Sequence, residues 1–259
     1  MTKRNQARPA IKERGDREIY AAIKAIPPLI VRVDGRNFRH LLRDGFEKPY
    51  DERFAKGLVD SAVIFFEQSG FDPKLAYLFS DEINLYFTHV PFKCRIEKLD
   101  SVIAGFFASA LTIMLNFKEP ITFDARIIPM CGGDDVLEYL LQRQAEAWRN
   151  HLNAYGYYGL QASGLTEKEA EQRLRGMKAA QVHELLFRQG INLSETPAWQ
   201  RRGMMVAKER YEKEGYNPKT AKDVTVTRYK IVQLWDPPLF GSAEGRELIA
   251  RLIGNENLS

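Results

Sequence analysis

Two short acidic motifs contain the residues of this chain best suited to chemistry. Asp34 opens the motif at residues 34–38 (Asp-Gly-Arg-Asn-Phe) after an apolar run, and Ser80-Asp81-Glu82 separates two further apolar runs. Carboxylates on a rigid sheet edge bind hard divalent cations, and Mg²⁺ takes one or two of them together with substrate phosphates. Two such ions about 4 Å apart stabilise the attacking and leaving oxygens of a phosphoryl transfer. The motifs therefore predict phosphoryl-transfer chemistry, provided that the fold brings Asp34 and Asp81 together.

Each motif alone also has a plainer interpretation. An Asp-Gly pair after a strand is commonly only a turn, and Asp81 and Glu82 are ordinary polar residues of a hairpin. Successive backbone N–H groups after a strand, as at residues 34–38, are in turn suited to cradle a phosphate. The elements that carry the motifs decide between these interpretations.

The pattern of apolar residues predicts an α+β domain in the first half of the chain. Strands are predicted at residues 29–33, 76–79, 83–87 and 121–128, and helices at 51–69 and 98–117. The order βαββαβ is that of a ferredoxin-like domain. In the usual arrangement of this fold the strand order is 4-1-3-2. The end of the first strand then shares a sheet edge with the hairpin joining strands two and three, so Asp34 and Asp81 meet on adjacent strands.

Apolar periodicity also predicts which face of each helix is buried. In the helix at 51–69 that face carries Phe54, Leu58, Ala62 and Phe65, and Gly70 ends the helix. In the helix at 98–117 it carries Val102, Phe106, Ala110, Ile113 and Phe117.

The composition changes after residue 130, where helices are predicted. Asp134 and Asp135 are expected to cap a helix that runs to about residue 154. Thr166 and Glu169 form a capping box for a second helix, and a third ends at Gly190. Residues 225–234 are predicted to form a strand or a hairpin arm.

These patterns divide the chain into three parts. Residues 1–26 are a basic N-terminal extension, 27–130 the βαββαβ domain with both acidic motifs, and 131–259 a helical region with a C-terminal arm.

Composition bounds the class of protein. The chain has 259 residues, of which 44% are hydrophobic and 28% charged, as in a globular protein with a substantial core. No apolar run approaches the roughly 18 residues of a membrane span, and the N-terminal residues lack the apolar core of a signal peptide. Cys94 and Cys131 form no CxxC motif, so neither a zinc site nor a disulfide framework is expected. We therefore expect a cytoplasmic protein with no membrane partner.

Positive charge is concentrated in two stretches. The formal net charge is +4, and residues 1–26 hold seven Lys or Arg against three acidic residues. Residues 200–230 hold nine Lys or Arg against four acids. Two basic patches on a neutral body fit a polyanionic partner, although solvated surface residues would give the same pattern.

Seven segments occur in a familiar order: RVDGRNF (32–38), FEKPYDERF (46–54), YLFSDEINLYF (77–87), FDARI (123–127), QRQAEAWRN (142–150), LLFRQGIN (185–192) and WQRRG (199–203). Together they resemble the histidine-tRNA guanylyltransferase family, especially its archaeal and bacterial guanylyltransferase-like branch. The resemblance covers roughly residues 27–205. It implies that residues 27–130 are a catalytic domain like a polymerase palm, and that 131–259 are a fingers-like region with a tRNA-contacting C-terminal arm. It implies a 3′-to-5′ polymerase that adds nucleotides to the 5′ end of tRNA after ATP or GTP has activated a 5′-monophosphate.

The resemblance also implies roles for individual residues. Asp34 and Asp81 would be the catalytic carboxylates and the ligands of two Mg²⁺ ions, with the Gly35 carbonyl as a third ligand. The nucleoside triphosphate, ATP, GTP or another NTP, would be held by the residues of both motifs and two nearby cations: Asp34, Gly35, Arg36, Asn37, Phe38, Arg39, Lys48, Ser80 and Asp81. Assembly as a homotetramer, a dimer of dimers, is implied as well. The charge pattern, in contrast, predicts that tRNA phosphates contact Arg201, Arg202, Lys208 and Arg210 together with the basic N-terminal extension. Arg143, Arg149 and Asn150 are further candidates for RNA contact.

Several residues near the two motifs have two possible roles each. Glu82 either supports its neighbouring ligand or points away from it, and Asp124 and Arg126 form either an ion pair or part of the catalytic machinery. Arg143 and Gln144 contact either RNA or the sheet domain.

Two departures from the family pattern affect the expected substrate. Trp148 stands where eukaryotic members have a histidine, and Val182 lies where a lysine is expected. Both positions are linked in the family to 5′ activation and to guanylation of histidine tRNA. The departures favour template-dependent repair of 5′-truncated tRNA, with addition of G to histidine tRNA as the alternative.

Two other functions compete with these. A palm-type nucleotidyl cyclase is suggested by the sequence Gly-Gly-Asp-Asp at 132–135, but such a signature belongs in the hairpin between strands two and three. A catalytically idle tRNA-binding protein is the second alternative, and it would be expected to have lost Asp34 or Asp81.

Overall fold

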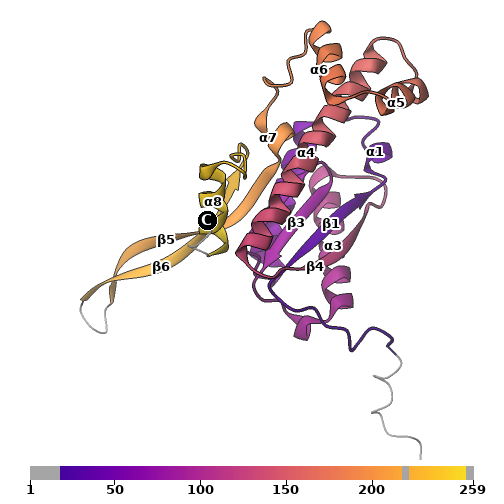
Figure 1. Ribbon diagram of the computed structural model, residues 1–259. Coiled ribbons are helices and arrows are strands. Elements are labelled where there is room, and N and C mark those ends of the chain that lie inside the picture. The colour runs from indigo at the N-terminus through magenta and orange to yellow at the C-terminus, as the bar shows by residue number, and fades with distance from the viewer. Residues whose placement is uncertain (1–17, 218–221, 255–259) are drawn as a thin grey trace, which may run out of the picture.

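The computed structural model describes residues 18–217 and 222–254 (Figure 1). Lys3 to Arg17 of the basic N-terminal stretch, and Lys219 of the second one, lie outside these residues. The strands are β1 (Leu29–Arg36), β2 (Leu75–Phe79), β3 (Glu82–Phe87), β4 (Thr122–Pro129), β5 (Met204–Asn217) and β6 (Lys222–Leu234). They form one antiparallel sheet in the order β4-β1-β3-β2-β5-β6. The predicted order 4-1-3-2 is confirmed, as is the α+β class, and β5 and β6 extend the sheet beyond β2.

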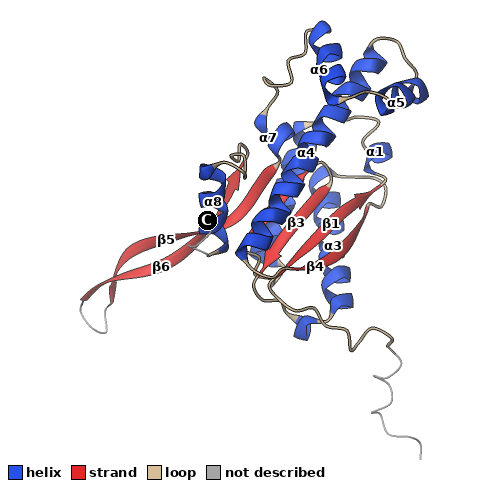
Figure 2. Cartoon of the chain, in the orientation of Figure 1, coloured by secondary structure: helices blue, strands red, loops and turns tan. Residues whose placement is uncertain are grey.

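Helices cover both faces of this sheet (Figure 2). They are α1 (Phe38–Leu41), α2 (Glu52–Gln68), α3 (Ile96–Leu115), α4 (Gly133–Ala162), α5 (Glu167–Arg175), α6 (Ala179–Arg188), α7 (Ala198–Arg202) and α8 (Ala243–Ile253), with a 3₁₀ turn η2 at Phe92–Cys94. One buried cluster joins α2 and α3 to one face of the sheet, and a second joins α4 and α8 to the other.

The alternation of side chains along the strands assigns residues to these two faces. Leu29, Val31 and Val33 of β1 belong to the cluster under α2 and α3, whereas Ile30 belongs to the cluster under α4. The even-numbered residues of β1 therefore point toward α4, and Asp34 is among them.

The ends of helix α2 follow the prediction. The Asp51 side chain accepts hydrogen bonds from the backbone N–H groups of Arg53 and Phe54, which satisfies two donors of the first turn. Gly70 follows the helix with a φ of 76°, a conformation that favours glycine. The predicted core face, including Leu58 and Phe65, is fully buried.

The predicted face of helix α3 is wrong. Val102 and Ile113 are 38% and 79% exposed, and the buried residues are Leu99, Ile103, Phe107 and Leu111. The helix is apolar on nearly all sides, so its periodicity did not distinguish one face. By length and composition alone α3 is also apolar enough for a membrane span, contrary to the expectation from the sequence, but one of its faces packs on the sheet.

Helix α4 begins at Gly133, before both of its predicted caps, Asp134 and Asp135, and it is longer than predicted. Its N-cap is Gly132, and Asp134 and Asp135 lie in the first turn, where negative charge still favours the helix dipole. The helix continues to Ala162 through Gly156, whose missing Cβ leaves space for Leu174 and Val182 of the helical region. The capping box of Thr166 and Glu169 is confirmed.

The C-terminal part of the chain holds two elements that the sequence analysis missed. Strand β5 pairs with β2 and with β6, and the β5–β6 hairpin projects beyond the sheet (Figure 1). Helix α8 packs on the α4 face through Ile249 and Leu252. Its boundaries have clear signals, because Ser242 caps the first turn and Gly254 follows the last with a positive φ.

Candidate active site

The ends of β1 and β3 bring the two acidic motifs together. In the β1–β3 register Asp34 lies opposite Glu82, and the Gly35 N–H donates to the Asp81 carbonyl at 3.1 Å. Asp34 and Asp81 line one cavity of about 380 Å³. The cavity is lined by Arg32, Asp34, Phe79, Ser80, Asp81, Glu82, Arg143, Glu146 and Asn150. The predicted juxtaposition of the two aspartates is thus present.

Burial and negative charge make this cavity electrostatically unusual. The pKa of Asp81 is raised to about 6, first by burial and then by the charges of Asp34 and Glu82. The Ser80 hydroxyl, 3.0 Å from the Asp81 carboxylate, opposes this by donating a hydrogen bond. Among the described residues, no cationic side chain forms an ion pair with Asp34 or Asp81. The lining holds four carboxylates against the two arginines Arg32 and Arg143, so the site carries a net negative charge.

This excess of negative charge fits a divalent cation. Oxygen ligands from one or two carboxylates, with the remainder from a substrate, are what Mg²⁺ takes in proteins. Within residues 18–217 and 222–254, no three His, Cys, Asp or Glu side chains are arranged to hold a metal. An ion here would therefore rest on Asp34, Asp81 and backbone or substrate oxygens.

Backbone geometry brings the first motif close to Asp81. A Cβ on Gly35 would lie 2.5 Å from a ring carbon of Phe38 and 2.8 Å from the Asp81 carboxylate, so only glycine fits there. Asn37 turns the chain with a φ of 62°. Phe38 is then buried against Phe123, with ring centroids 5.1 Å apart. The motif is thus a tight turn anchored in the core by its phenylalanine.

The cations assigned to the nucleotide lie around this turn. Arg36 is exposed, whereas the Arg39 guanidinium pairs with Glu171 and lies 4.6 Å from the ring centre of Tyr157. The Lys48 ammonium donates to the Leu42 carbonyl, and burial lowers its pKa.

A second cavity adjoins the carboxylates. It has a volume of about 270 Å³ and shares Phe79, Ser80 and Asn150 with the first. Its walls are largely aromatic and aliphatic, with a few amide groups, a combination suited to a planar ring. The complete lining is Leu42, Phe46, Glu47, Lys48, Pro49, Tyr50, Asp51, Phe54, Ala55, Phe79, Ser80, Ala147, Asn150, Asn153, Ala154, Trp199, Gln200 and Met204.

Sequence reasoning missed most of this second wall. Tyr50 lies two residues after Lys48, in a segment that carries the family resemblance, so its sequence position pointed to the site. Trp199 and Gln200 come from α7, whose position against the sheet follows from packing that no local pattern reveals.

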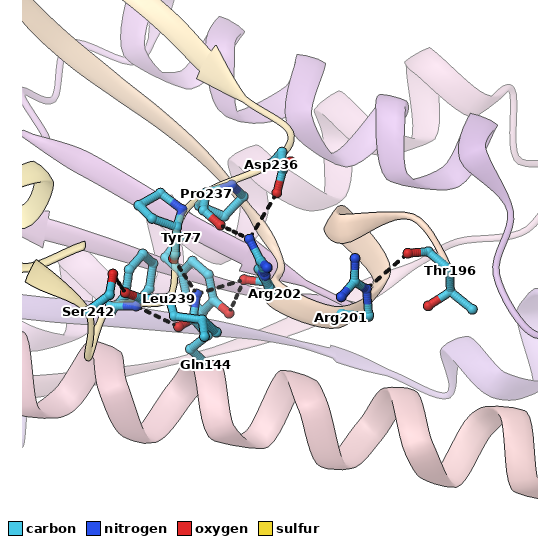
Figure 3. Close-up of polar contacts among 11 residues, drawn as sticks. Tyr77, Gln144, Thr196, Arg201, Arg202, Asp236, Pro237, Leu239 and Ser242 are labelled. Carbon is cyan, nitrogen blue, oxygen red and sulfur yellow. Dashed lines mark hydrogen bonds and ion pairs between the residues drawn. The ribbon is translucent and has the colours of Figure 1, made fainter. Parts of the chain in front are cut away.

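The arginines assigned to RNA have partners within the protein. Arg143 forms an ion pair with Glu82, and Arg149 pairs with Glu146. Arg201 donates to the Thr196 carbonyl at 2.9 Å, and Arg202 forms an ion pair with Asp236 (Figure 3).

Tyr77 of β2 joins α7 to the sheet, and Gln144 of α4 holds the chain after β6 (Figure 3). The Tyr77 hydroxyl donates to the Arg202 carbonyl at 2.8 Å. The Gln144 amide donates to the Pro238 carbonyl and accepts from the Phe240 N–H at 3.1 and 2.8 Å. Gln144 therefore contacts α7 and the chain after β6, which the sequence analysis did not predict.

The two departures from the family pattern meet in one apolar cluster. Val182 is buried with Leu186 and Leu193, and Trp148 packs against them. Trp148 also stacks on His151, with ring centroids 5.3 Å apart. Both residues act here as packing groups.

Two further sequence features are resolved by position. Asp124 lies opposite Asp34 in the β1–β4 register and pairs with Arg126 at 3.2 Å. The Gly-Gly-Asp-Asp segment at 132–135 lies at the start of α4, and the β2–β3 turn carries Ser80 and Asp81 instead. The Gly-Gly-Asp-Asp segment is therefore not in the β2–β3 turn, where a cyclase signature would be expected.

Comparisons with known proteins agree with this geometry. Residues 16–131 match the family model described as tRNAHis guanylyltransferase, and residues 134–233 match that of the Thg1 C-terminal domain. The chain is 32% identical over 193 residues to the probable tRNA(His) guanylyltransferase of Drosophila melanogaster. That alignment covers 70% of this chain and 67% of the fly protein. The human relative of the same name is 32% identical over 190 residues. That alignment covers 69% of this chain and 63% of the human protein.

Solved structures share the fold. The tRNA(His) guanylyltransferase crystal structure from Saccharomyces cerevisiae matches with a TM-score of 0.66 and 25% identity, covering 76% of this chain and 93% of that one. A bacterial Thg1-like protein in complex with ATP matches with a TM-score of 0.72 and 22% identity, covering 94% and 99% of the two chains.

Proposed function

The chain belongs to the tRNAHis guanylyltransferase family, and from that premise we propose that it adds nucleotides to the 5′ end of tRNA. Asp34 and Asp81, in one cavity at the ends of β1 and β2, are the observation that carries the proposal. In the proposed reaction the 3′-hydroxyl of a nucleoside triphosphate attacks the activated 5′-phosphate of the RNA. A phosphodiester bond forms, and the activating group leaves.

Asp34, Asp81 and the Gly35 carbonyl are the groups that would hold two Mg²⁺ ions. Bound there, the ions would offset the negative charge of the reacting phosphates and of the leaving oxygen. The net negative charge around Asp81 supports this assignment. The turn at Gly35 to Phe38 and the Ser80 hydroxyl would orient the triphosphate beside the carboxylates.

The second cavity is proposed to take the base of a nucleotide. Its aromatic and aliphatic walls adjoin the carboxylates through Phe79 and Ser80. Lys48 on its rim is available to a phosphate as a point charge once it leaves the Leu42 carbonyl. Bacterial Thg1-like proteins have been solved in complex with ATP and with GTP, which supports nucleoside triphosphates as substrates.

Template-directed repair of a 5′-truncated tRNA is the mode that we infer for this chain. The positions of Trp148 and Val182, which carry charge or a titrating group in the family pattern, lie in an apolar cluster here. Neither Trp148 nor Val182 provides a charged or titrating group that could activate a 5′-monophosphate. Base pairing with the opposite strand of the acceptor stem would then select the nucleotide that is added.

Addition of G to histidine tRNA is the second candidate. The names of the fly and human relatives favour it, since both are given as probable tRNA(His) guanylyltransferases. The carboxylate site serves either mode, because the bond formed is the same.

The β5–β6 hairpin is proposed to contact the tRNA backbone. Arg210 and Lys213 are exposed on β5, and Arg228 is exposed on β6. Lys208, also assigned to RNA, is instead paired with Asp72 near the base of the hairpin. Exposed cations of this kind bind phosphates with little dependence on sequence.

We also propose a cytoplasmic homotetramer, as expected from the sequence. Exposed apolar side chains near the N-terminal segment support assembly, among them Ile19, Tyr20 and Ile26. Light scattering of the purified chain measures the number of copies.

Nucleotide addition to a tRNA that lacks its first 5′ nucleotide tests the proposed function. The RNA carries a 5′-triphosphate, each labelled NTP is supplied alone with Mg²⁺, and full-length histidine tRNA is assayed in parallel. Addition only of the nucleotide that pairs with the 3′-side partner establishes template-directed repair. Addition of G to histidine tRNA whatever the opposing base establishes the second mode. No label on either RNA, or a cyclic dinucleotide formed from GTP alone, overturns the proposal.

A further inference from the structure

We propose that Arg143 positions the Ser80–Asp81 turn by holding the residues on both sides of it. The inference rests on the proposed function, because it makes Arg143 a positioning residue for the same carboxylate site. Arg143 lies on α4 and lines the cavity together with Asp34 of β1.

The first contact of Arg143 is with the residue after the turn. Its Nε lies 3.0 Å from one Glu82 carboxylate oxygen, and its Nη2 lies 3.2 Å from the other. The two side chains are only 17% and 10% exposed. The Nη2 contact is a hydrogen bond, and the Nε contact is an ion pair without hydrogen-bond geometry, so the guanidinium holds the Glu82 carboxylate at two points.

The second contact is with the residue before the turn. The centre of the Arg143 guanidinium lies 5.6 Å from the ring centre of Phe79, within the range of a cation–π contact. Phe79 is itself buried in the cluster between the sheet and α4. One side chain of α4 therefore contacts both neighbours of the Ser80–Asp81 pair.

The turn between these two contacts needs support. Ser80 has a φ of 50°, a conformation that residues other than glycine adopt at a cost. Asp81 is held within the protein by the Ser80 hydroxyl and by the Gly35 N–H on its carbonyl. Loss of the clamp on Glu82 and Phe79 would let the Asp81 carboxylate move relative to Asp34.

Glu82 is also fixed from the sheet side. The Asn84 amide donates to Glu82 at 2.9 Å, and the Tyr139 hydroxyl of α4 donates to Asn84 at 2.6 Å. Arg143 and Tyr139 are four residues apart, one turn of the same helix. Helix α4 thus holds the start of β3 at two points, and the placement of Asp81 depends on the docking of that helix.

Contact with RNA is the competing role for Arg143. Its guanidinium already contacts a carboxylate and an aromatic ring, and its side chain is largely buried. A phosphate would have to displace Glu82, which would then be a buried carboxylate without its cation. The structure therefore favours positioning over RNA binding.

The experiment compares Arg143→Met, Arg143→Lys and Glu82→Gln with wild type. Arg188→Met is the matched control, because Arg188 is exposed on α6 and pairs with Glu184. Three quantities are measured: Mn²⁺ affinity by electron paramagnetic resonance without RNA, kcat and KM for nucleotide addition, and tRNA Kd as a function of salt. Circular dichroism establishes that each variant is folded.

The positioning role predicts a specific combination of results. Arg143→Met weakens Mn²⁺ binding and lowers kcat by about 10- to 100-fold each, the range typical for residues that orient metal ligands. Its tRNA Kd and salt slope stay at the wild-type values, and the control is unchanged throughout. The Mn²⁺ affinity and kcat of Arg143→Lys lie between those of Arg143→Met and wild type, because an ammonium keeps the charge but not the two-point contact.

Two results would overturn the inference. A weaker tRNA Kd with a salt slope reduced by about one identifies Arg143 as a phosphate contact. Unchanged Mn²⁺ affinity in Arg143→Met, or in Arg143→Lys and Glu82→Gln if the first variant does not fold, excludes positioning. The Mn²⁺ measurement needs no reaction, so it separates failure of this inference from failure of the proposed function, which is seen as an inactive wild type.

Discussion

Asp34 lies directly opposite Glu82 in the register of β1 and β3, on the face of the sheet that α4 covers. Glu82 is compensated by Arg143, and Asp124, opposite Asp34 on β4, by Arg126, whereas Asp34 and Asp81 form no ion pair among the described residues. The four carboxylates therefore divide into two that are paired within the protein and two that remain available to a cation. This division is the physical basis of the proposed active site.

Gly35→Ala is expected to disturb the active site and the fold together. The added Cβ would lie within 3 Å of the buried Phe38 ring and of the Asp81 carboxylate. We expect a loss of about 1–3 kcal/mol in the free energy of unfolding, as for other overpacked sites, and a large loss of nucleotide addition. Urea unfolding and the addition assay measure the two effects.

Gly105→Ala is the control for this substitution. Gly105 lies on α3 with no atom within 4 Å of the position of a Cβ. Alanine there should stabilise the helix by about 0.5–1 kcal/mol. A Gly35→Ala enzyme with full activity and unchanged stability would contradict the close packing described here.

Gln144→Leu should destabilise the protein. The substitution leaves the buried Phe240 N–H and the Pro238 carbonyl without their partner, at an expected cost of about 2–4 kcal/mol. Gln142→Leu, at an exposed position on the same helix, should change the free energy of unfolding by less than about 0.5 kcal/mol. Equal stability of the two variants in urea unfolding would show that the Gln144 hydrogen bonds contribute little.

His151 should make stability depend on pH. Burial, and then the charge of Arg201, lower its pKa from the ordinary 6.5 to about 4. Its Nε2 lies 2.9 Å from the Thr196 hydroxyl, which already donates to the Leu193 carbonyl, so the proton is assigned to Nε2. The buried Nδ1 has no partner, and a second proton there has no acceptor.

The sign of this effect follows from the two states. The unfolded chain takes up the proton as pH falls through about 6.5, whereas the folded protein does so only near 4. The free energy of unfolding therefore decreases as the pH is lowered from about 6.5 to about 4. The contribution of this group is about 2 kcal/mol lost between pH 7 and pH 5. In His151→Gln the free energy of unfolding should change less over this range than in wild type or in the exposed-site variant His40→Gln. Identical pH profiles for all three would contradict the assignment.

The exposed cations of the β5–β6 hairpin should contribute to tRNA affinity. Replacing Arg210 and Lys213 by glutamine should weaken tRNA binding, and the slope of log K against log salt should fall by about one for each phosphate that the variant no longer binds. Filter binding at several salt concentrations measures both. Arg188→Gln, on the exposed face of α6, should leave the slope unchanged. Unaltered binding by the hairpin variant would remove the hairpin from the RNA-binding surface.

The sequence was informative where local pattern and topology agree. The apolar runs around Val31, Leu78 and Leu85 identify strands because buried strands need such runs, and the βαββαβ order then determines that Asp34 and Asp81 are neighbours. The face of α3 was not predictable in this way, because Val102 and Ile113 are as apolar as the residues that the helix buries.

Contacts between distant segments account for what the sequence did not reveal. The outer half of β5 is charged and exposed on both faces, so its residues do not alternate between apolar and polar. Arg143, Arg201 and Arg202 look like surface cations in the sequence, and only the packing of α4 and α7 reveals their partners Glu82, Thr196 and Asp236. The same holds for the second cavity, whose walls come from four separate parts of the chain.

Single-turnover transfer of a labelled nucleotide to 5′-triphosphorylated, truncated tRNA tests the central claim most directly. Wild type is compared with Asp34→Asn, Asp81→Asn and the control Asp60→Asn, whose aspartate pairs with Lys56 on α2 away from the cavity. The account predicts that each of the first two loses at least about 10³-fold in rate, with tRNA binding and circular dichroism unchanged, while the control keeps the wild-type rate. Transfer at the wild-type rate by either Asp34→Asn or Asp81→Asn would contradict it.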